Sequence, residues 1–196
     1  MAKLLFQGHG SFRLTSAAGQ IVYIDPFAGE GYDIPADLIL VSHQHGDHNQ
    51  VELCVQKPHC CVITNTEALA DGVHQSFEVD GIGILAVQAY NQNHSVNECV
   101  GFIVTVDGVK IYFSADTSTT DDMAGFAAMK LDYAILCGDG VYNMDMAEAA
   151  ECAKLIGAKH NILVHTTPGV LYDADKTAAW DAPNKLVVAA GEEIQL

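Results

Sequence analysis

Short apolar runs separated by polar turns recur along the whole chain and predict a protein built mainly from β-strands. The predicted strands cover residues 11–15, 21–24, 38–41, 84–87, 101–106, 109–113, 133–137, 162–164 and 186–189. Apolar and polar residues alternate on both sides of Asp107-Gly108, a pair that is typical of a tight turn. We therefore expect residues 101–113 to form a β-hairpin.

Helical patterns are fewer and become clear in the second half of the chain. The strongest runs from Met146 to Ile156, where four alanines favour a helix and Gly157 provides a stop. Asp145 and Glu148 have the spacing of a capping box at its start. Two shorter amphipathic helices are predicted over residues 67–70 and 123–129. Strands that come first in pairs and later alternate with helices indicate an α/β (α+β) protein.

Length and composition indicate one domain over residues 1–196. The chain is 49% hydrophobic, which is enough for a buried core. No apolar run approaches the roughly 18 residues of a membrane span, and the apolar start is too short for a secretory signal. The six cysteines form no CxxC pair and are expected to be reduced. We therefore expect a cytoplasmic protein without a membrane partner.

The charge of the chain argues against nucleic acid as a partner. Its formal net charge is −16, with 9 basic and 25 acidic residues. Phosphate backbones are bound by clusters of Lys and Arg, which this sequence lacks. An anionic substrate would have to be attracted locally by bound metal ions. We expect a small-molecule substrate and no nucleic acid, and the sequence leaves open whether copies of the chain associate.

The segment from His43 to His48 is the clearest chemical signal, because it places three imidazoles and a carboxylate within one loop after the strand at 38–41. Nitrogen and oxygen ligands of this kind suit zinc and similar divalent metals. Alternate loop residues project in opposite directions, so His43 and His45 can reach one ion while Asp47 and His48 reach a neighbour. Gly46 allows the backbone to turn between them.

This His-x-His-x-Asp-His pattern resembles the hallmark of the metallo-β-lactamase superfamily, in which more distant His, Asp and His ligands follow. Matching residues follow predicted strands at His94, Asp116 and His165. The stretches 8–12, 24–27 and 143–165 are similar to small bacterial metal-dependent hydrolases related to ascorbate-6-phosphate lactonase. The chain departs from the usual pattern in having Ala115 before Asp116, where glycine is usual, and Thr166 after the last histidine, where tyrosine is frequent.

The resemblance implies a four-layer αββα sandwich and a metal-dependent hydrolase with two divalent ions. Zinc is favoured by ligand type over manganese or iron. The ligand set it implies is His43, His45 and His94 on one ion, Asp47, His48 and His165 on the other, and Asp116 between them. A hydroxide held between the ions would attack a small ester, lactone or phosphodiester. Asp47 and Asp116 are the expected catalytic carboxylates, and either Asp47 or a water protonates the leaving group.

Several residues outside this set have two interpretations. Asp25 suits a partner that orients a ligating imidazole, but an aspartate before proline is also ordinary in turns. His9, between two glycines, either faces the site or closes a turn, and Asp139 either supports the site or lies in a solvated turn. Tyr142, Asn143 and Thr166 are candidates to line a substrate pocket. His59, His74 and His160 are expected at the surface.

Two alternative functions use the same features. A diiron oxidoreductase on this fold usually has glutamate where this chain has His45. A non-catalytic metal-binding or scaffold protein would be expected to lack a ligand, whereas all seven candidates are present. Lactones, esters, thioesters, amides and phosphodiesters all remain open as substrates, because a fold does not select among them.

Overall fold

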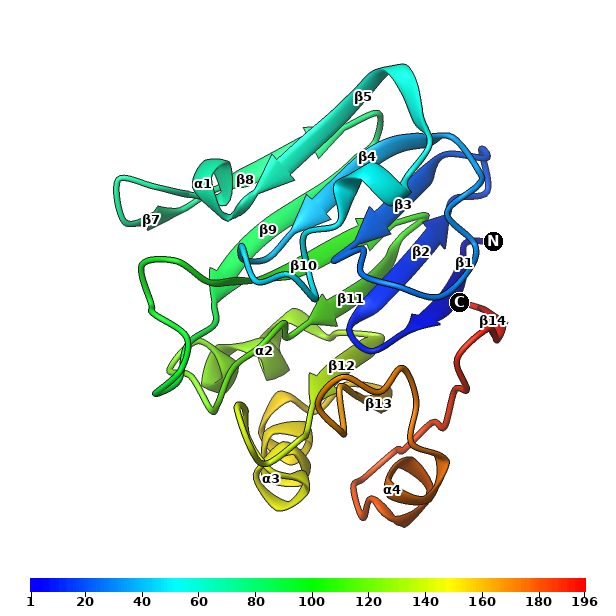
Figure 1. The fold of residues 1–196 in the computed structure, drawn as a ribbon. Helices are drawn as coiled ribbons and strands as arrows, with labels where there is room; N and C mark the ends of the chain where they lie inside the picture. The colour runs from blue at the N-terminus through cyan, green and yellow to red at the C-terminus, as the bar shows by residue number, and fades with distance from the viewer.

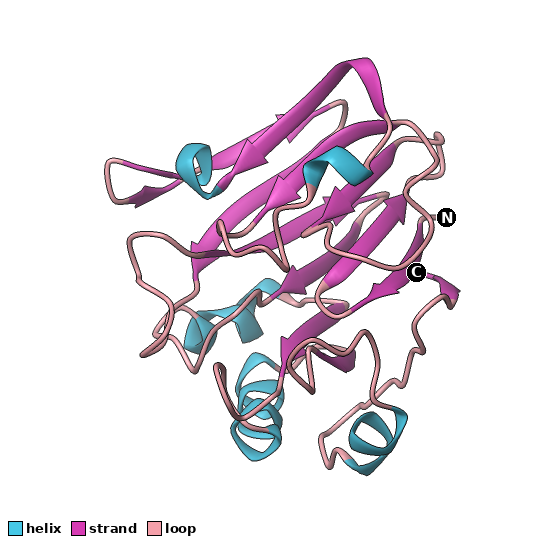
Figure 2. Ribbon diagram, in the orientation of Figure 1, coloured by secondary structure: helices cyan, strands magenta, loops and turns pink.

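The computed structural model describes residues 1–196 and contains two six-stranded mixed sheets packed face to face (Figures 1 and 2). The first sheet has the order β14-β1-β2-β3-β4-β5, and the second has the order β13-β12-β11-β10-β9-β8. The strands of the first sheet are β1 (Lys3–Gly8), β2 (Ser11–Thr15), β3 (Ile21–Ile24), β4 (Ala36–Val41), β5 (Gln56–Thr64) and β14 (Glu193–Gln195). Those of the second are β8 (Ser76–Val79), β9 (Ile82–Gln88), β10 (Val100–Val106), β11 (Val109–Phe113), β12 (Tyr133–Cys137) and β13 (His160–Val164).

The two sheets have matching pairing patterns. In the first, β1, β2 and β3 pair antiparallel, while β3, β4 and β5 pair parallel. In the second, β9, β10 and β11 pair antiparallel, while β11, β12 and β13 pair parallel. The remaining elements are β6 (Leu69–Ala70), β7 (Val73–His74), α1 (Asn65–Ala68), α2 (Met123–Met129), α3 (Met146–Ile156), α4 (Ala174–Ala179) and a 3-10 helix (Val51–Leu53).

The main core lies between the sheets. Phe12 on β2 stacks on Phe6 of β1 and meets Phe113 of β11 edge to face, with ring centroids 4.9 and 5.5 Å apart. All three rings are buried, as the alternation of apolar residues along these strands requires. The phenylalanines thus join the two sheets beneath the loops that follow β4, β11 and β13.

The outer faces of the sandwich are covered unequally. A second apolar cluster packs α2 and α3 against the second sheet and includes the buried Trp180, which follows α4. The outer face of the first sheet is covered by the segment containing Tyr32 and by the 3-10 helix near Cys54. Figure 1 shows the three longer helices beside the second sheet. The predicted sandwich is confirmed. Helices α2 and α3 cover the second sheet, whereas the outer face of the first sheet is covered by a loop segment and a 3-10 helix.

Several local predictions are confirmed. The hairpin forms, with Val106 opposite Val109. Helices α2 and α3 have the expected ranges, and the Asp145 side chain accepts a hydrogen bond from the Glu148 amide. The capping box is only half formed, however, because the Glu148 carboxylate accepts hydrogen bonds from the backbone and hydroxyl of Thr119. Glu148 therefore ties α3 to the loop after Asp116.

Other local predictions are wrong. The helix expected at 67–70 is the four-residue α1, which Thr64 and Glu67 cap before the chain turns into β6. Residues 186–189 form no strand, although the Leu186 amide donates to the Asn161 carbonyl beside β13. Strand β5 was not predicted, because its first residues are polar and exposed and include a proline. Polar side chains and proline are typical of an edge strand, which is where β5 lies.

Candidate metal centre

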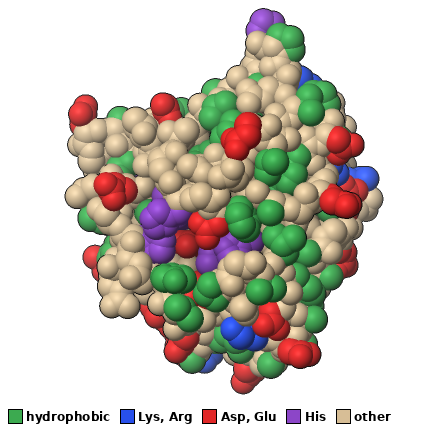
Figure 3. Space-filling model, viewed as in Figure 1, with side chains coloured by type: hydrophobic (Ala, Val, Ile, Leu, Met, Phe, Trp, Pro, Cys, Tyr) green, Lys and Arg blue, Asp and Glu red, His purple; other side chains and the backbone are tan.

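The candidate ligands lie on loops that leave the same end of the sandwich. Strand β4 ends at Val41, two residues before His43, and β11 and β13 end three and one residues before Asp116 and His165. Parallel strands bring their carboxyl ends to one edge of a sheet, so these loops converge. Figure 3 shows histidine and acidic side chains together in a hollow on this face. The fold therefore brings together candidate ligands that are separated by more than a hundred residues in the sequence.

His43, His45 and His94 form the first group. Each offers a ligand atom, and these atoms all lie within 4.8 Å of one another. The His45 ring lies 4.7 Å from the His43 ring and 4.9 Å from the His94 ring, centroid to centroid. His43 and His94 are buried, whereas His45 is exposed. The geometry thus brings together the three residues expected on one ion and leaves that position open to solvent at His45.

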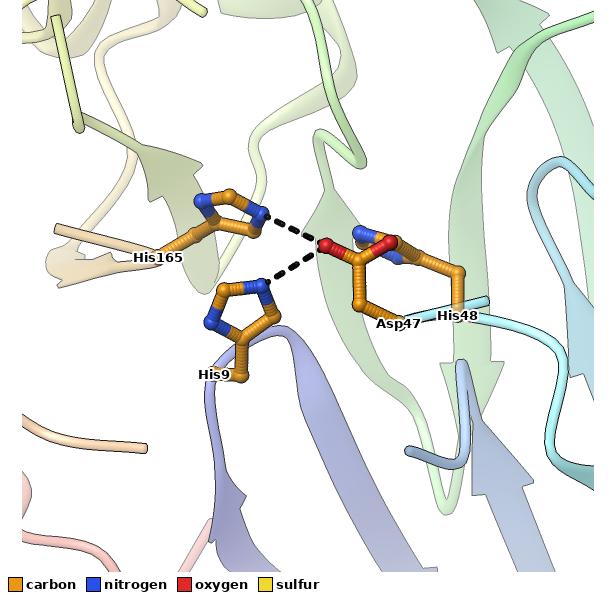
Figure 4. Close-up of side chains that lie close together, drawn as sticks. All are labelled: His9, Asp47, His48 and His165. Carbon is orange, nitrogen blue, oxygen red and sulfur yellow. Dashed lines mark hydrogen bonds and ion pairs between the residues drawn. The ribbon is translucent and has the colours of Figure 1, made fainter. Parts of the chain in front are cut away.

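Asp47, His48 and His165 form the second group, and His9 joins them (Figure 4). Nε2 of His9 and Nε2 of His165 lie 3.2 and 3.8 Å from the same Oδ2 of Asp47. The His9 and His165 rings are in contact, with centroids 3.7 Å apart and ring planes tilted by 41°. Of the two interpretations of His9, the structure supports the one in which the side chain faces the site.

The β1–β2 turn that carries His9 is shaped for this close approach. His9 has a φ of +57°, and backbone hydrogen bonds join its carbonyl to the His165 amide and its amide to the Leu171 carbonyl. A Cβ at Gly10 would lie 3.1 Å from the His48 ring. Glycine at this position therefore lets the turn pack directly against a candidate ligand.

Asp116 lies between the two groups. Its carboxylate oxygens are 3.3 Å from Nε2 of His48, 3.4 Å from Nε2 of His94 and 3.5 Å from Nε2 of His165. Burial alone would raise the pKa of Asp116, but the neighbouring imidazoles hold this pKa well below its usual range. A buried carboxylate that faces both groups has the position that a bridging ligand needs.

Asp25 orients two of the histidines from behind. It accepts hydrogen bonds from the Ser42 amide and hydroxyl, both at 2.7 Å, and from Nδ1 of His48 at 3.0 Å. Because the Ser42 hydroxyl donates to Asp25, its oxygen is free to accept from Nδ1 of His43 at 2.9 Å. Both rings are thereby held with Nε2 directed into the site, which supports the orienting role considered for Asp25.

Two further buried candidate ligands, His94 and His165, also have a polar side chain next to Nδ1. Nδ1 of His94 donates to the Asn91 side chain at 3.0 Å, and Nδ1 of His165 lies 3.1 Å from Oδ2 of Asp139. Asp139 is itself fixed by the Asn143 side chain, and its other oxygen accepts from the Val141 and Tyr142 amides. The structure thus supports the interpretation in which Asp139 serves the site.

Sequence reasoning missed Ser42 and Asn91. Each is a small polar residue close in sequence to a candidate ligand, Ser42 next to His43 and Asn91 three residues before His94. That proximity is a usable signal, because a ligating imidazole needs a partner for its second nitrogen. It is a weak signal by itself, since serine and asparagine are common in loops.

The buried histidines differ in the direction in which their pKa values are shifted. Burial lowers the pKa of His43 to about 2, so this ring is neutral. Burial would also lower the pKa of His48, but Asp116 and Asp25 outweigh it and raise the pKa well above its usual value. At His165 burial is outweighed by Asp116, Asp139 and Asp47, which raise its pKa to about 9. In the metal-free protein His48 and His165 therefore carry protons that a cation would replace.

Zinc binding is expected to release about two protons per chain near neutral pH, because His48 and His165 must lose theirs to become ligands. Isothermal titration in buffers of different ionisation enthalpy measures this number. The release should decrease as the pH is raised past about 9, where His165 is already neutral before metal arrives. The variant His165→Gln should release about one proton fewer. Release near zero at neutral pH would contradict the proposed protonation of both rings.

The residues present fit divalent cations. Nε2 of His43, Nε2 of His48 and Oδ1 of Asp116 are buried with no hydrogen-bond partner, as is Nε2 of His165. Buried polar atoms rarely stay unpaired, and groups left so need a ligand or an ion to explain them. The set of imidazole nitrogens and carboxylate oxygens is the one that zinc and related metals prefer.

Comparisons with known proteins agree with this geometry. The model of the β-lactamase superfamily domain matches residues 3–165. A UPF0173 metal-dependent hydrolase of Nitratidesulfovibrio vulgaris is 31% identical over 83% of this chain and 79% of its own length. A crystal structure from Parabacteroides distasonis, of a protein described as a metal-dependent hydrolase, has a TM-score of 0.75 and 26% identity, covering 96% of this chain and 93% of that one.

The fold has further support from a metallo-β-lactamase fold protein of Bacillus subtilis. It covers 100% of both chains with a TM-score of 0.76 at 16% identity. An identity this low shows the fold alone. Together with the matched domain and the His/Asp clusters, these similarities show that the chain belongs to the metallo-β-lactamase superfamily and, within it, to the UPF0173 metal-dependent hydrolases.

Proposed function

We propose that this protein hydrolyses a small ester, lactone or phosphodiester with two divalent metal ions, zinc being favoured by its ligands. One observation carries the proposal. Four buried donor atoms, on His43, His48, His165 and Asp116, converge without hydrogen-bond partners. Nδ1 of His43 and Nδ1 of His48 are hydrogen-bonded to Ser42 and Asp25, and Nδ1 of His165 lies 3.1 Å from Oδ2 of Asp139. Side chains tethered in this way are arranged in advance to bind cations.

The ligand assignment follows the two groups of side chains. One ion would be held by His43, His45 and His94. The other would be held by Asp47, His48 and His165, and Asp116 would bind both ions. When bound, such a pair supplies a water of lowered pKa and polarises the substrate oxygen. Hydrogen bonds at Nδ1 keep the rings of His43, His48 and His94 in place, and Asp139 lies against Nδ1 of His165. Asp116 would offset part of the cationic charge.

We assign proton transfer to Asp47. Its side chain is 36% exposed, whereas that of Asp116 is 5% exposed, so Asp47 is the carboxylate that solvent and substrate can reach. The neighbouring rings of His165 and His9 hold the pKa of Asp47 well below its usual range. Asp47 is therefore ionised at neutral pH, and it can accept a proton from the attacking water and return that proton to the leaving oxygen.

The cavity over the site fits a small substrate. It has a volume of about 280 Å³ and is lined by His45, Asp47, Asn93, His94, Asp116, Tyr142, His165, Pro168 and Gly169. This volume is near the lower end of the usual range for small-molecule sites. Tyr142 lines it, as predicted from the sequence. The same prediction is wrong for Asn143 and Thr166, which lie buried behind the cavity wall.

We further propose that the protein binds no nucleic acid. None of its nine basic residues lines this cavity. A track for a polyanion needs several contiguous Lys or Arg side chains, since each bound phosphate takes one. No helix of the protein is long and apolar enough to cross a membrane. A compact substrate held by the metal ions and a few polar groups fits these observations best.

The fully loaded protein is expected to contain about two transition-metal ions per chain, because seven ligands exceed what one tetrahedral zinc can use. Elemental analysis after loading and desalting gives the number. The variant His165→Ala should retain about one ion, since it loses a ligand of the second group only. A wild-type value near one that His165→Ala leaves unchanged would overturn the dinuclear assignment.

The zinc-loaded protein is expected to turn over small esters or lactones and to leave structured RNA intact at low salt. Low salt is the stringent condition, because polyanion binding is strongest there. Chromogenic esters, lactones and bis-aryl phosphodiesters form the test panel, and Asp116→Ala serves as the inactive control. RNA cleavage that Asp116→Ala abolishes, without turnover of any small substrate, would make the protein a nuclease.

A further inference from the structure

A second cavity of about 270 Å³ adjoins the one over the candidate metal centre. Its lining consists of His43, Gln44, His45, Asn65, Asn93, His94, Ser95, Glu98 and Cys99. The two cavities share His45, Asn93 and His94. A molecule whose reacting group lies over the metal centre can therefore extend past these three residues into the second cavity.

Side-chain amides and one carboxylate dominate the lining of this second cavity. Nε2 of Gln44 donates to Oδ1 of Asn65 at 2.9 Å, and Nδ2 of Asn65 donates to the Glu98 carbonyl at 2.9 Å. These contacts join the loop after β4, helix α1 and the loop after β9 into one wall. Nδ2 of Asn93 donates to the Tyr142 carbonyl at 2.8 Å, which fixes the shared boundary. The wall is thus polar and held in place.

Free hydrogen-bonding groups remain on this wall. The Glu98 carboxylate takes part in no hydrogen bond or ion pair, and Oδ1 of Asn93 accepts none within the protein. Cys99 is the single hydrophobic residue of the lining, so an alkyl chain would find little apolar surface there. Acceptors such as these are suited to hydroxyl groups, which donate to carboxylate and amide oxygens.

Neither cavity contains a lysine or arginine. Two lysines illustrate how basic side chains are engaged elsewhere: Lys57 pairs with Asp37, and Lys176 donates to the carbonyl of Thr166, the residue after His165. The ion proposed on His43, His45 and His94 lies at one side of the second cavity, where the reacting group would bind. On the side away from this ion, a phosphate or carboxylate on the distant part of a substrate would meet no lysine or arginine. It would instead face Glu98 within a chain of net charge −16.

We propose that the substrate is an uncharged ester or lactone bearing several hydroxyl groups, with its hydroxyl-bearing part held in the second cavity by Glu98 and Asn93. This inference rests on the proposed function for the reaction itself. The oxygen of water bonds to the acyl carbon as the acyl C–O bond breaks. One proton of that water passes to the leaving oxygen, which becomes an alcohol, and the other is released to solvent, so that the acyl product is a carboxylate. The acyl group would bind at the metal centre, and the second cavity would favour substrates whose remaining part is polar and uncharged.

Binding of three hydroxamates to the zinc-loaded protein tests the selectivity without turnover. All carry the same metal-binding head, while the tails are a gluconic polyol, the same polyol with a 6-phosphate, and an unbranched hexanoyl chain. The polyol is expected to bind at least about tenfold more tightly than either of the others, as measured by isothermal titration. Equal or tighter binding of the phosphorylated or the alkyl compound would overturn the proposal.

Two charge-reversal variants test whether Glu98 itself causes the preference for the neutral polyol. Glu98→Lys should shift the preference between phosphorylated and neutral polyol by at least about tenfold toward the phosphate. Glu78→Lys is the matched control, because Glu78 is exposed on β8, lines neither cavity and changes the net charge equally. Equal shifts in the two variants would assign the selectivity to overall charge and overturn the role of the second cavity.

Turnover of gulono-1,4-lactone and its 6-phosphate separates this inference from the proposed function. Hydrolysis of both, with the phosphorylated lactone preferred, would overturn the inference and leave the hydrolase assignment standing. The expected hydroxamate selectivity without hydrolysis of any ester or lactone would overturn the proposed reaction and leave the polar binding site. Preferred hydrolysis of the neutral lactone, reduced in Glu98→Lys and retained in Glu78→Lys, is the result expected if both hold.

Discussion

The variant Asp116→Ala is expected to lose at least about 10³-fold in kcat/KM, which corresponds to about 4 kcal/mol of transition-state stabilisation. Asp116 is the buried carboxylate that lies within 3.5 Å of His48, His94 and His165, so its removal affects both groups of candidate ligands. The measurement is steady-state turnover of the best ester or lactone under saturating zinc. Metal content is determined on the same samples.

Asp25→Ala is the matched comparison, because Asp25 is also buried but reaches the site only through Ser42 and His48. Loss of such an orienting partner typically costs about 10–100-fold in metal affinity or activity. Saturating zinc should restore part of the Asp25→Ala activity and little of the Asp116→Ala activity. Equal or reversed losses would mean that the bridging and orienting roles have been assigned to the wrong carboxylates.

The sequence predicted which candidate ligands lie together, and where many of the strands lie, for a physical reason. His43, His45, Asp47 and His48 are neighbours in one loop, so their proximity does not depend on the fold. Strand periodicity identified the ends of β4, β11 and β13, and ligands placed just after parallel strands meet at one edge. Local pattern and chain order together therefore indicated a metal centre before any tertiary contact was known.

The role of His9 could not be derived in this way. Its contact with Asp47 depends on the left-handed backbone of the β1–β2 turn and on backbone hydrogen bonds to His165 and Leu171, which are remote in sequence. The amide-lined wall beside His45 was hidden for the same reason. Gln44, Asn65 and Glu98 come from three separate segments, and only their packing makes them one surface.

The failed strand and helix predictions have a common cause. The spacing of apolar residues along the chain indicates which residues are buried. It gives a wrong secondary structure where a strand is exposed or where a buried segment is not a strand. Strand β5 is a sheet edge with polar, exposed residues at its start, so its pattern is that of a loop. Residues 186–189 are apolar because Val188 packs into the main core, although they pair with no strand.

Removal of the metals is expected to lower the melting temperature of the protein by at least about 10 °C. Each ion present at a thousandfold excess over its Kd contributes about 4 kcal/mol to the free energy of unfolding, and each kcal/mol shifts the Tm of a chain of this length by about 2–4 °C. Differential scanning calorimetry of zinc-loaded and chelator-dialysed protein measures the difference. Asp116→Ala, which binds metal less well, should show a smaller difference.

The pH dependence of the metal-free protein supplies an independent check on the same cluster. In the folded, metal-free chain the pKa of His165 is raised to about 9 from its usual 6.5, chiefly because Asp116 and Asp139 outweigh burial. A raised pKa means that protonated His165 stabilises the fold fully below about pH 6.5, and that this stabilisation is lost as the pH rises to about 9. The Tm of the metal-free protein should therefore fall across this interval. That of the zinc-loaded protein should change little, because His165 would there be bound to the metal as proposed. A metal-free Tm that stays constant or rises from pH 6.5 to 9, or equal Tm values with and without zinc, would show that the carboxylates around His165 do not form the charged cluster on which the metal centre depends.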